Sequence, residues 1–159
     1  MSAGESRAAL SLGSNLGDRE LNLTRARAAL EAYAGGGRDA PGAAAGAGAA
    51  AIEILAASAP RSTAPQGFTA QPDFLNQVLL VRTALSPWEL LEACLEVERG
   101  LGRVRGPIRW GPRTIDVDVL AYDGLVVRDE RLTLPHAALP LRPFFLEMMR
   151  EIGAAELLP

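Results

Sequence analysis

The stretch that most constrains the fold lies at residues 114–120, Thr-Ile-Asp-Val-Asp-Val-Leu, where polar and apolar side chains alternate. Such alternation, with β-branched residues, predicts a β-strand, and residues two apart on a strand point to the same face. Asp116 and Asp118 are therefore expected side by side, with the apolar residues around them on the opposite face. Paired carboxylates need a compensating charge, and a hard cation such as Mg²⁺ supplies one through oxygen ligands. The alternative is a solvated strand face that binds nothing.

An arginine-rich segment precedes this strand. Residues 99–113 hold five arginines among Gly and Pro residues: Arg99, Arg103, Arg105, Arg109 and Arg113. A guanidinium can grip phosphate oxygens with two parallel hydrogen bonds, and a Gly/Pro-hinged loop can close over a polyphosphate and exclude water. A solvated basic loop and an RNA-binding patch are the alternatives. Trp110, inside this segment, either anchors it against the core or covers a planar ligand.

The composition excludes several functions. Every basic residue other than the one His is arginine, so a P-loop and lysine Schiff-base chemistry are excluded. One Cys and one His cannot build a structural zinc site, and one Cys cannot form an internal disulfide. The net charge of −3 gives no overall attraction to nucleic acid or membrane. Without a signal-peptide core or a strongly apolar stretch, we expect a cytoplasmic protein.

Apolar periodicity and turn residues predict five strands and three helices along the chain. The predicted strands are at residues 8–12, 52–58, 74–83, 115–121 and 125–128, and the predicted helices at about 18–33, 86–100 and 144–152. Ser86, Pro87 and Glu89 predict a capped start of the second helix, and Asp123-Gly124 predicts a hairpin between the last two strands. The Gly/Ala-rich residues 34–51 predict a flexible loop, and residues 60–72 and 131–142 predict Pro-containing loops.

A length of 159 residues predicts one domain over residues 1–159, and the predicted element order in it is β-α-β-β-α-β-β-α. Two helices placed between strands favour an α+β, ferredoxin-like (split βαβ) fold. Its mostly antiparallel sheet would be covered by helices in an αβα sandwich.

Isolated polar and aromatic residues add weaker candidates. Phe74 and Asn76 would share a strand face, where a ring can stack on a flat heterocycle and an amide can bond its edge. A packing role for Phe74 and a capping role for Asn76 remain the alternatives. His136 lies in a loop with Arg131 and Arg142 nearby in sequence, and could contact phosphate; a surface or hydrogen-bonding His is the alternative.

Together these stretches resemble the 6-hydroxymethyl-7,8-dihydropterin pyrophosphokinase family of folate biosynthesis. The resemblance spans about residues 8–152, and its most specific part is the block 109–118 followed by Leu134-Pro135-His136. The other matching stretches are residues 12–18, 63–67, 71–76, 102–105 and 131–136, with Arg142 and Phe144 beyond them.

The resemblance implies transfer of the β,γ-pyrophosphoryl group of ATP to the pterin hydroxymethyl oxygen, with release of AMP. It implies that Asp116 and Asp118 hold two Mg²⁺ ions and that Arg103 and Arg113 neutralise charge during transfer. The implied ATP-binding residues are Glu98, Arg105, Trp110, Arg131, Thr133, His136 and Arg142. The implied pterin-binding residues are Thr63, Ala64, Pro65, Gln66, Phe74, Asn76 and Phe144. Only small-molecule partners and a monomer are expected.

A few positions depart from the family pattern. Ala64 stands where a Thr-Pro-Pro run is common, and Leu95 where a polar residue on the ATP side is frequent. Met148-Met149 replaces a usual Pro-Leu in the last helix.

Two other functions stay open. A ferredoxin-like RNA-binding module would grip phosphates without consuming ATP, but an aromatic content of 5% and the lack of an RNP1-like run disfavour it. A metal-dependent phosphohydrolase would turn over ATP without a pterin.

Overall fold

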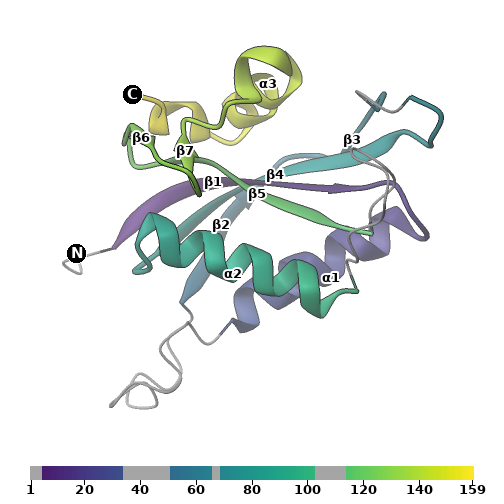
Figure 1. The fold of residues 1–159 in the computed structure, drawn as a ribbon, viewed down its shortest axis with the longest axis horizontal. Helices are drawn as coiled ribbons and strands as arrows, with labels where there is room; N and C mark the ends of the chain where they lie inside the picture. The colour runs from purple at the N-terminus through teal and green to yellow at the C-terminus, as the bar shows by residue number, and fades with distance from the viewer. Residues whose placement is uncertain (1–4, 34–50, 66–68, 103–113) are drawn as a thin grey trace.

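The structure, a computed structural model, describes residues 5–33, 51–65, 69–102 and 114–159 (Figure 1). Its strands are β1 (Ser6–Ser14), β2 (Ile52–Ala57), β3 (Arg61–Thr63), β4 (Phe74–Thr83), β5 (Asp116–Tyr122), β6 (Val127–Arg128) and β7 (Thr133–Leu134). Its helices are α1 (Arg19–Ala32), α2 (Pro87–Gly100) and α3 (Pro143–Glu151), with short 3₁₀ helices η2 (Leu139–Leu141) and η3 (Ala154–Leu157).

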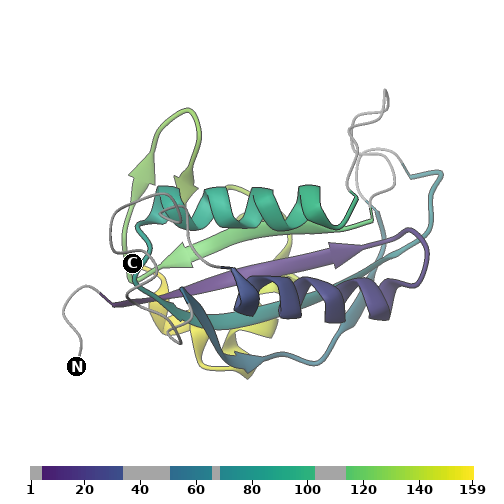
Figure 2. The same ribbon diagram turned by 90° about the horizontal axis from the view of Figure 1, so that it is seen from below.

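The main sheet has the strand order β2-β4-β1-β5, and β3 pairs with β4 beyond the end of β2. All of its strand pairs are antiparallel. Figure 2 shows α1 and α2 crossing the same face of this sheet. Because α1 follows β1 and α2 follows β4, each helix lies between two strands of one sheet, as in a split βαβ unit. The predicted α+β, ferredoxin-like fold is confirmed.

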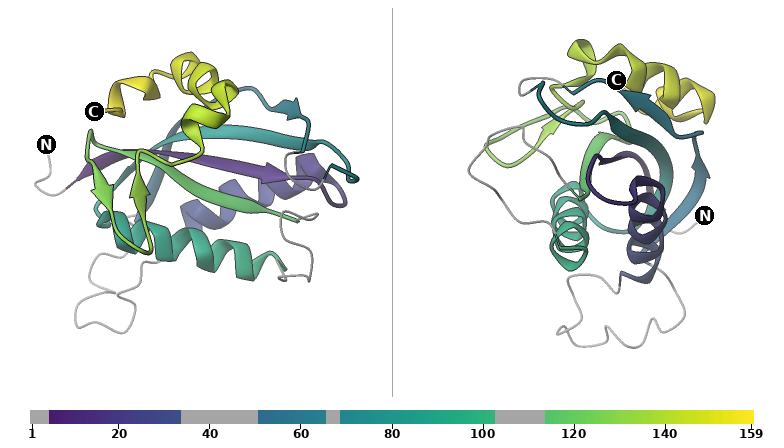
Figure 3. Two further views of the ribbon diagram at one scale, coloured as in Figure 1. Left: turned by 45° about the horizontal axis from the view of Figure 1, so that its top comes forward. Right: turned by 90° about the vertical axis from the view of Figure 1, so that its right-hand side faces the viewer.

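Alternation along the central strands gives the sheet an apolar core on each face. Leu10, Leu79 and Val117 pack under α1 and α2, while Val78 and Leu120 pack under α3 and η3. Figure 3 shows the sheet between these two helical layers. Met148 and Met149 are fully buried in the α3 layer. The departure from the family pattern at these two positions therefore affects the packing of the core.

Local sequence signals set the helix starts. The Asp18 side chain accepts a hydrogen bond from the Leu21 N–H at the start of α1. Ser86 and Glu89 form a reciprocal capping box at α2, with Pro87 in the first turn. Both features satisfy backbone N–H groups that a helix start leaves unpaired.

The chain after β5 differs from the expected hairpin. Asp123 (φ 50°) and Gly124 (φ 75°) do form a tight turn, closed by the Leu125 N–H bond to the Tyr122 carbonyl at 2.9 Å. However, β6 pairs with β7 instead of β5, so the hairpin prediction was wrong. The edge of β5 is already occupied, because the His136 N–H donates to the Leu120 carbonyl at 2.9 Å.

Two predicted loops also contain short strands. β3 forms within residues 60–72 and β7 within residues 131–142. The Gly/Ala-rich residues 34–50, predicted as a flexible loop, lie outside the described residues. None of the helices that the structure describes is long and apolar enough to cross a membrane.

Candidate active site

The two carboxylates lie on one face of β5, as the alternating sequence predicts. Asp116 and Asp118 are both partly exposed, whereas Val117 and Val119 are 2% exposed in the opposite core. On the neighbouring β1, Gly13 lies opposite Asp116 and Ser11 opposite Asp118. Small residues beside the carboxylates leave room above the sheet for a ligand.

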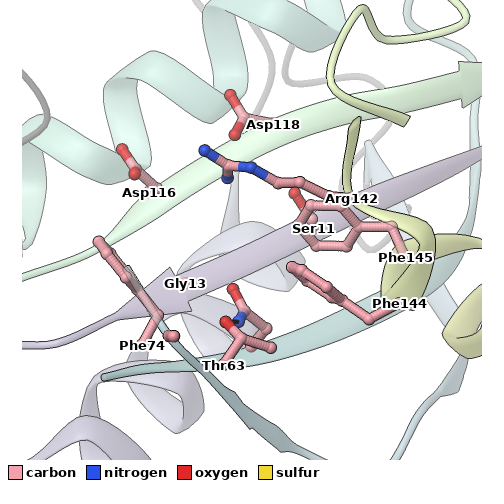
Figure 4. Close-up of a pocket in the computed structure, with 11 residues that line it drawn as sticks. Ser11, Gly13, Thr63, Phe74, Asp116, Asp118, Arg142, Phe144 and Phe145 are labelled. Atoms are coloured by element: carbon pink, nitrogen blue, oxygen red, sulfur yellow. Dashed lines mark hydrogen bonds between the residues drawn. The ribbon is translucent and has the colours of Figure 1, made fainter. Parts of the chain in front are cut away.

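A pocket opens on this face at the meeting point of four strands and the start of α3 (Figure 4). β5 contributes Asp116 and Asp118, and α3 with its preceding residue contributes Arg142 and Phe144. The other lining residues are Ser11, Gly13, Thr63, Ala64, Phe74, Asn76 and Phe145. In Figure 4, Phe74 and Phe144 lie on opposite sides of the opening, with Thr63 between them and the carboxylates above.

Most of the residues proposed for the pterin therefore come together, although they come from three elements. Thr63, Ala64, Phe74, Asn76 and Phe144 all line this pocket. Pro65 is half-buried beyond the lining residues, and Gln66 lies outside the described part of the chain.

The Asn76 amide is held in a fixed orientation. Asn76 is 6% exposed, and its Nδ2 donates to the Thr63 Oγ1 at 2.5 Å. A Cβ added at Gly13 would lie 3.0 Å from the Asn76 Oδ1 and 3.7 Å from the Phe74 ring. Gly13 thus provides the space for both side chains, a role that the sequence analysis missed. The signal available was small residues at alternate positions, Ser11 and Gly13, on either side of Leu12.

Arg142 brings a positive charge to the carboxylates. Its guanidinium points toward Asp116 and Asp118 in Figure 4. Its charge also reaches His136, whose pKa is lowered first by burial and then by Arg142.

A second pocket, of about 240 Å³, lies on the other side of Asp118. It brings together three of the residues proposed for ATP: Arg131, Thr133 and His136. Asp118 lines both pockets, so ligands in the two would meet at this carboxylate. Arg131 also forms an ion pair with Glu92 on α2.

The His136 ring has a defined tautomer. Its Nδ1 accepts the Ala138 N–H at 3.0 Å, so the proton of the neutral ring is on Nε2. That Nε2 lies 4.0 Å from the Asp118 Oδ1. Because the lowered pKa favours the neutral ring, His136 can offer a hydrogen-bond donor to a phosphate.

Glu98 lies behind the site and lines neither pocket. It is 4% exposed on α2, and its Oε2 accepts the Val117 N–H at 2.7 Å. This bond joins α2 to the strand segment between Asp116 and Asp118. In the described geometry Glu98 supports the carboxylate strand.

Residues 103–113 of the arginine-rich segment lie outside the described residues, whereas Arg99 belongs to the last turn of α2. Residues 103–113 include Arg103, Arg105, Arg109, Trp110 and Arg113, whose proposed roles stay predictions. Within the described residues, no three His, Cys, Asp or Glu side chains gather in a way that could hold a metal ion. Two carboxylates nevertheless suit Mg²⁺, which commonly takes one or two protein carboxylates and fills its other positions with water and substrate phosphates.

Fold and pocket define a class of protein: an α+β domain with a carboxylate pair beside a pocket lined by aromatic side chains. The chain belongs to the 7,8-dihydro-6-hydroxymethylpterin-pyrophosphokinase family, whose model matches residues 9–154. The resemblance drawn from the motifs is thereby confirmed.

Bacterial relatives match most of the chain. A 2-amino-4-hydroxy-6-hydroxymethyldihydropteridine pyrophosphokinase of Methylorubrum extorquens is 45% identical over 147 residues, covering 92% of this chain and 82% of the relative. Proteins of the same name from Bacillus subtilis and Aquifex aeolicus are 37% and 36% identical, each covering 90% of this chain. These matches cover 75% of the Bacillus protein and 78% of the Aquifex protein.

Proposed function

We propose that this chain transfers the β,γ-pyrophosphoryl group of ATP to the hydroxymethyl oxygen of 6-hydroxymethyl-7,8-dihydropterin. A bond forms between that oxygen and the β-phosphorus, and the bond from the β-phosphorus to the α,β-bridging oxygen breaks. The products are AMP and the pterin diphosphate, and the hydroxyl proton is released. The reaction belongs to folate biosynthesis.

One observation supports this reaction above the alternatives: a single pocket carries both an aromatic end and a carboxylate end. Phe74 and Phe144 lie on opposite sides of its opening, with Asn76 in its lining, while Asp116 and Asp118 lie at the other end (Figure 4). A flat pterin between the rings would direct its hydroxymethyl group toward the carboxylates. A simple phosphohydrolase needs no such aromatic end, and an RNA-binding sheet, which stacks bases on exposed aromatic rings, needs no carboxylate pair beside them.

We propose that Asp116 and Asp118 hold the Mg²⁺ ions that accompany ATP. Both side chains are partly exposed to the pocket, and hard oxygen donors are what Mg²⁺ prefers. Bound Mg²⁺ would neutralise charge on the triphosphate as the pyrophosphoryl group moves.

The chain's own residues position the two substrates, since phosphoryl transfer depends mainly on positioning and electrostatics. Asp116 would accept a hydrogen bond from the pterin hydroxyl and so orient its oxygen. His136 and Arg142 would contact ATP phosphates from their positions beside Asp118. Arg103 and Arg113 would neutralise the charge on the transferring group.

The deciding experiment measures AMP formation from Mg-ATP with and without 6-hydroxymethyl-7,8-dihydropterin. We expect AMP and the pterin diphosphate in equal amounts, and only when the pterin is present. ATP turnover without pterin would instead indicate a phosphohydrolase, and RNA binding without ATP turnover would indicate the binding module.

We also propose a cytoplasmic monomer, and light scattering should give the mass of one chain.

A further inference from the structure

A charged cluster joins β3 to α3 outside the pocket. The Arg61 Nη1 lies 2.7 Å from the Glu147 Oε1, and its Nη2 lies 4.0 Å from the Glu151 Oε1. Glu151 also accepts the Ala59 N–H at 3.2 Å through its Oε2. Two hydrogen bonds and one longer ion pair thus run from α3 to residues 59–61.

The same two elements both line the pocket, β3 through Thr63 and α3 through Phe144. Arg61 pairs directly with Asn76 and lies two residues before Thr63, so its side chain shares their face of the sheet. On α3, Glu147 follows Phe144 by three residues, which places both on neighbouring turns of one helix side. The charged cluster therefore fixes Phe144 relative to Thr63 and Asn76.

β3 has little else to hold it. It has three residues and, in the described part of the chain, pairs only with β4, at the outer side of the sheet. Short edge strands with one neighbour are among the least stable parts of a sheet. The contacts from Arg61 and Ala59 to α3 supply the second attachment.

We propose that Arg61 is a positioning residue, which acts through Glu147 and Glu151 to set the separation between β3 and Phe144 and hence the affinity for the planar substrate. This inference rests on the proposed pterin pocket. Arg61 lines neither pocket, so it acts by preorganising the site, which lowers the cost of ordering it on binding.

The test compares Arg61→Met with Arg61→Lys, which keeps a positive charge beside both Glu147 and Glu151. Exposed ion pairs contribute modestly, so we expect Arg61→Met to raise the Kd and KM for the pterin about three- to fivefold. The kcat and the KM for ATP should stay at wild-type values. Arg61→Lys should keep most of the pterin affinity, which a general effect of losing the Arg61 side chain would not predict.

Arg7→Met is the matched control. The Arg7 Nη1 lies 2.6 Å from the Glu156 Oε1, joining β1 to η3 with side-chain exposures of 43% and 60%, close to the 38% and 57% of Arg61 and Glu147. This variant should leave the pterin Kd unchanged.

Two results would overturn the inference: wild-type pterin affinity in Arg61→Met, or equal losses in Arg61→Met and Arg7→Met. Failure of the proposed function would look different, because the wild-type chain itself would then neither bind the pterin nor form AMP in its presence.

Discussion

At the scale of single residues, the site depends on a missing side chain as much as on charged ones. Gly13 lies between Asp116 on one neighbouring strand and Asn76 on the other. Its backbone is ordinary extended strand, so the absence of a Cβ matters for space rather than for backbone freedom. That space is where the Asn76 amide and the Phe74 ring approach the strand.

We predict that Gly13→Ala weakens pterin binding about tenfold. The new methyl group would lie 3.0 Å from the Asn76 Oδ1, so Asn76 must move and its bond to Thr63 is disturbed, at a cost of about 1–2 kcal/mol. Calorimetric titration with the pterin measures the change. Gly100→Ala is the control, because a Cβ there meets no atom within 4 Å. Unchanged affinity in Gly13→Ala would remove Asn76 from the binding site.

Asp116→Asn and Asp118→Asn should each lower kcat at least about 100-fold, with the fold retained. Each removes one charged metal ligand, and loss of about 3 kcal/mol of charge stabilisation gives that factor. Steady-state AMP formation at saturating Mg²⁺ measures the effect. Asp123→Asn is the control, since Asn tolerates the positive φ of 50° in that turn. Near-normal turnover in both site variants would refute the metal assignment.

The lowered pKa of His136 has a consequence for stability. In the folded protein, the pKa of His136 lies below its usual value of 6.5, so the ring is still neutral just below pH 6.5. In the unfolded chain, the same ring takes up its proton near pH 6.5. Stability therefore rises with pH through this window, and is lost as pH falls from about 6.5 to the folded pKa. His136→Asn should show a flatter dependence of the unfolding free energy between pH 7 and 5.

Since the chain has a single His, its NMR titration reports this pKa directly. Arg142→Gln should raise the value, because the Arg142 charge is the second cause of the shift after burial. A wild-type pKa at or above 6.5 would contradict the burial argument.

At the scale of elements, α2 and β5 form a unit that presents the carboxylates. β5 is an edge strand of the main sheet, so its outward N–H groups need partners from elsewhere. Glu98 supplies one at Val117, between the two aspartates. A carboxylate from the helix thus fixes the position of the strand that carries the site.

We predict that Glu98→Ala lowers the free energy of unfolding by about 2 kcal/mol, because the Val117 N–H is left buried without its acceptor. Urea unfolding of the wild-type and variant chains measures this difference in the free energy of unfolding. Glu96→Ala, an exposed position on the same helix, makes the same substitution and should change stability by less than about 0.5 kcal/mol. Equal effects of the two substitutions would mean that the bond to Val117 contributes nothing.

At the scale of the whole molecule, the two pockets share one residue. Asp118 lines the aromatic pocket under α3 and the pocket beside His136. A ligand in one pocket that moves Asp118 or neutralises its charge would therefore change ligand affinity in the other pocket.

We therefore predict that the pterin binds about 5- to 100-fold more tightly when an ATP analogue and Mg²⁺ are already bound, as expected for a coupling of about 1–3 kcal/mol. Calorimetry of the pterin with and without a non-hydrolysable analogue measures this. Coupling is reciprocal, so the analogue must gain the same factor from the pterin. Equal pterin affinity in both titrations would mean that the site is preformed.

Local signals were enough for much of the architecture. Alternation at residues 114–120 predicted the carboxylate pair, and Ser86 with Glu89 predicted the α2 capping box. These succeed because strand faces and helix caps depend on residues within a few positions of each other. The motifs also identified the family, whose model matches residues 9–154.

What the sequence could not determine depends on contacts between distant residues. Asp123 and Gly124 form the turn that their residue types favour, yet β6 pairs with β7 and not with β5. The His136 N–H bonds the Leu120 carbonyl on the β5 edge, where β6 would otherwise pair. The role of Gly13 becomes visible only when β4 places Asn76 and Phe74 beside it. A local sequence pattern determines which face of an element a side chain lies on. The packing of separate elements determines which other side chains it contacts, so only the tertiary structure assembles this pocket.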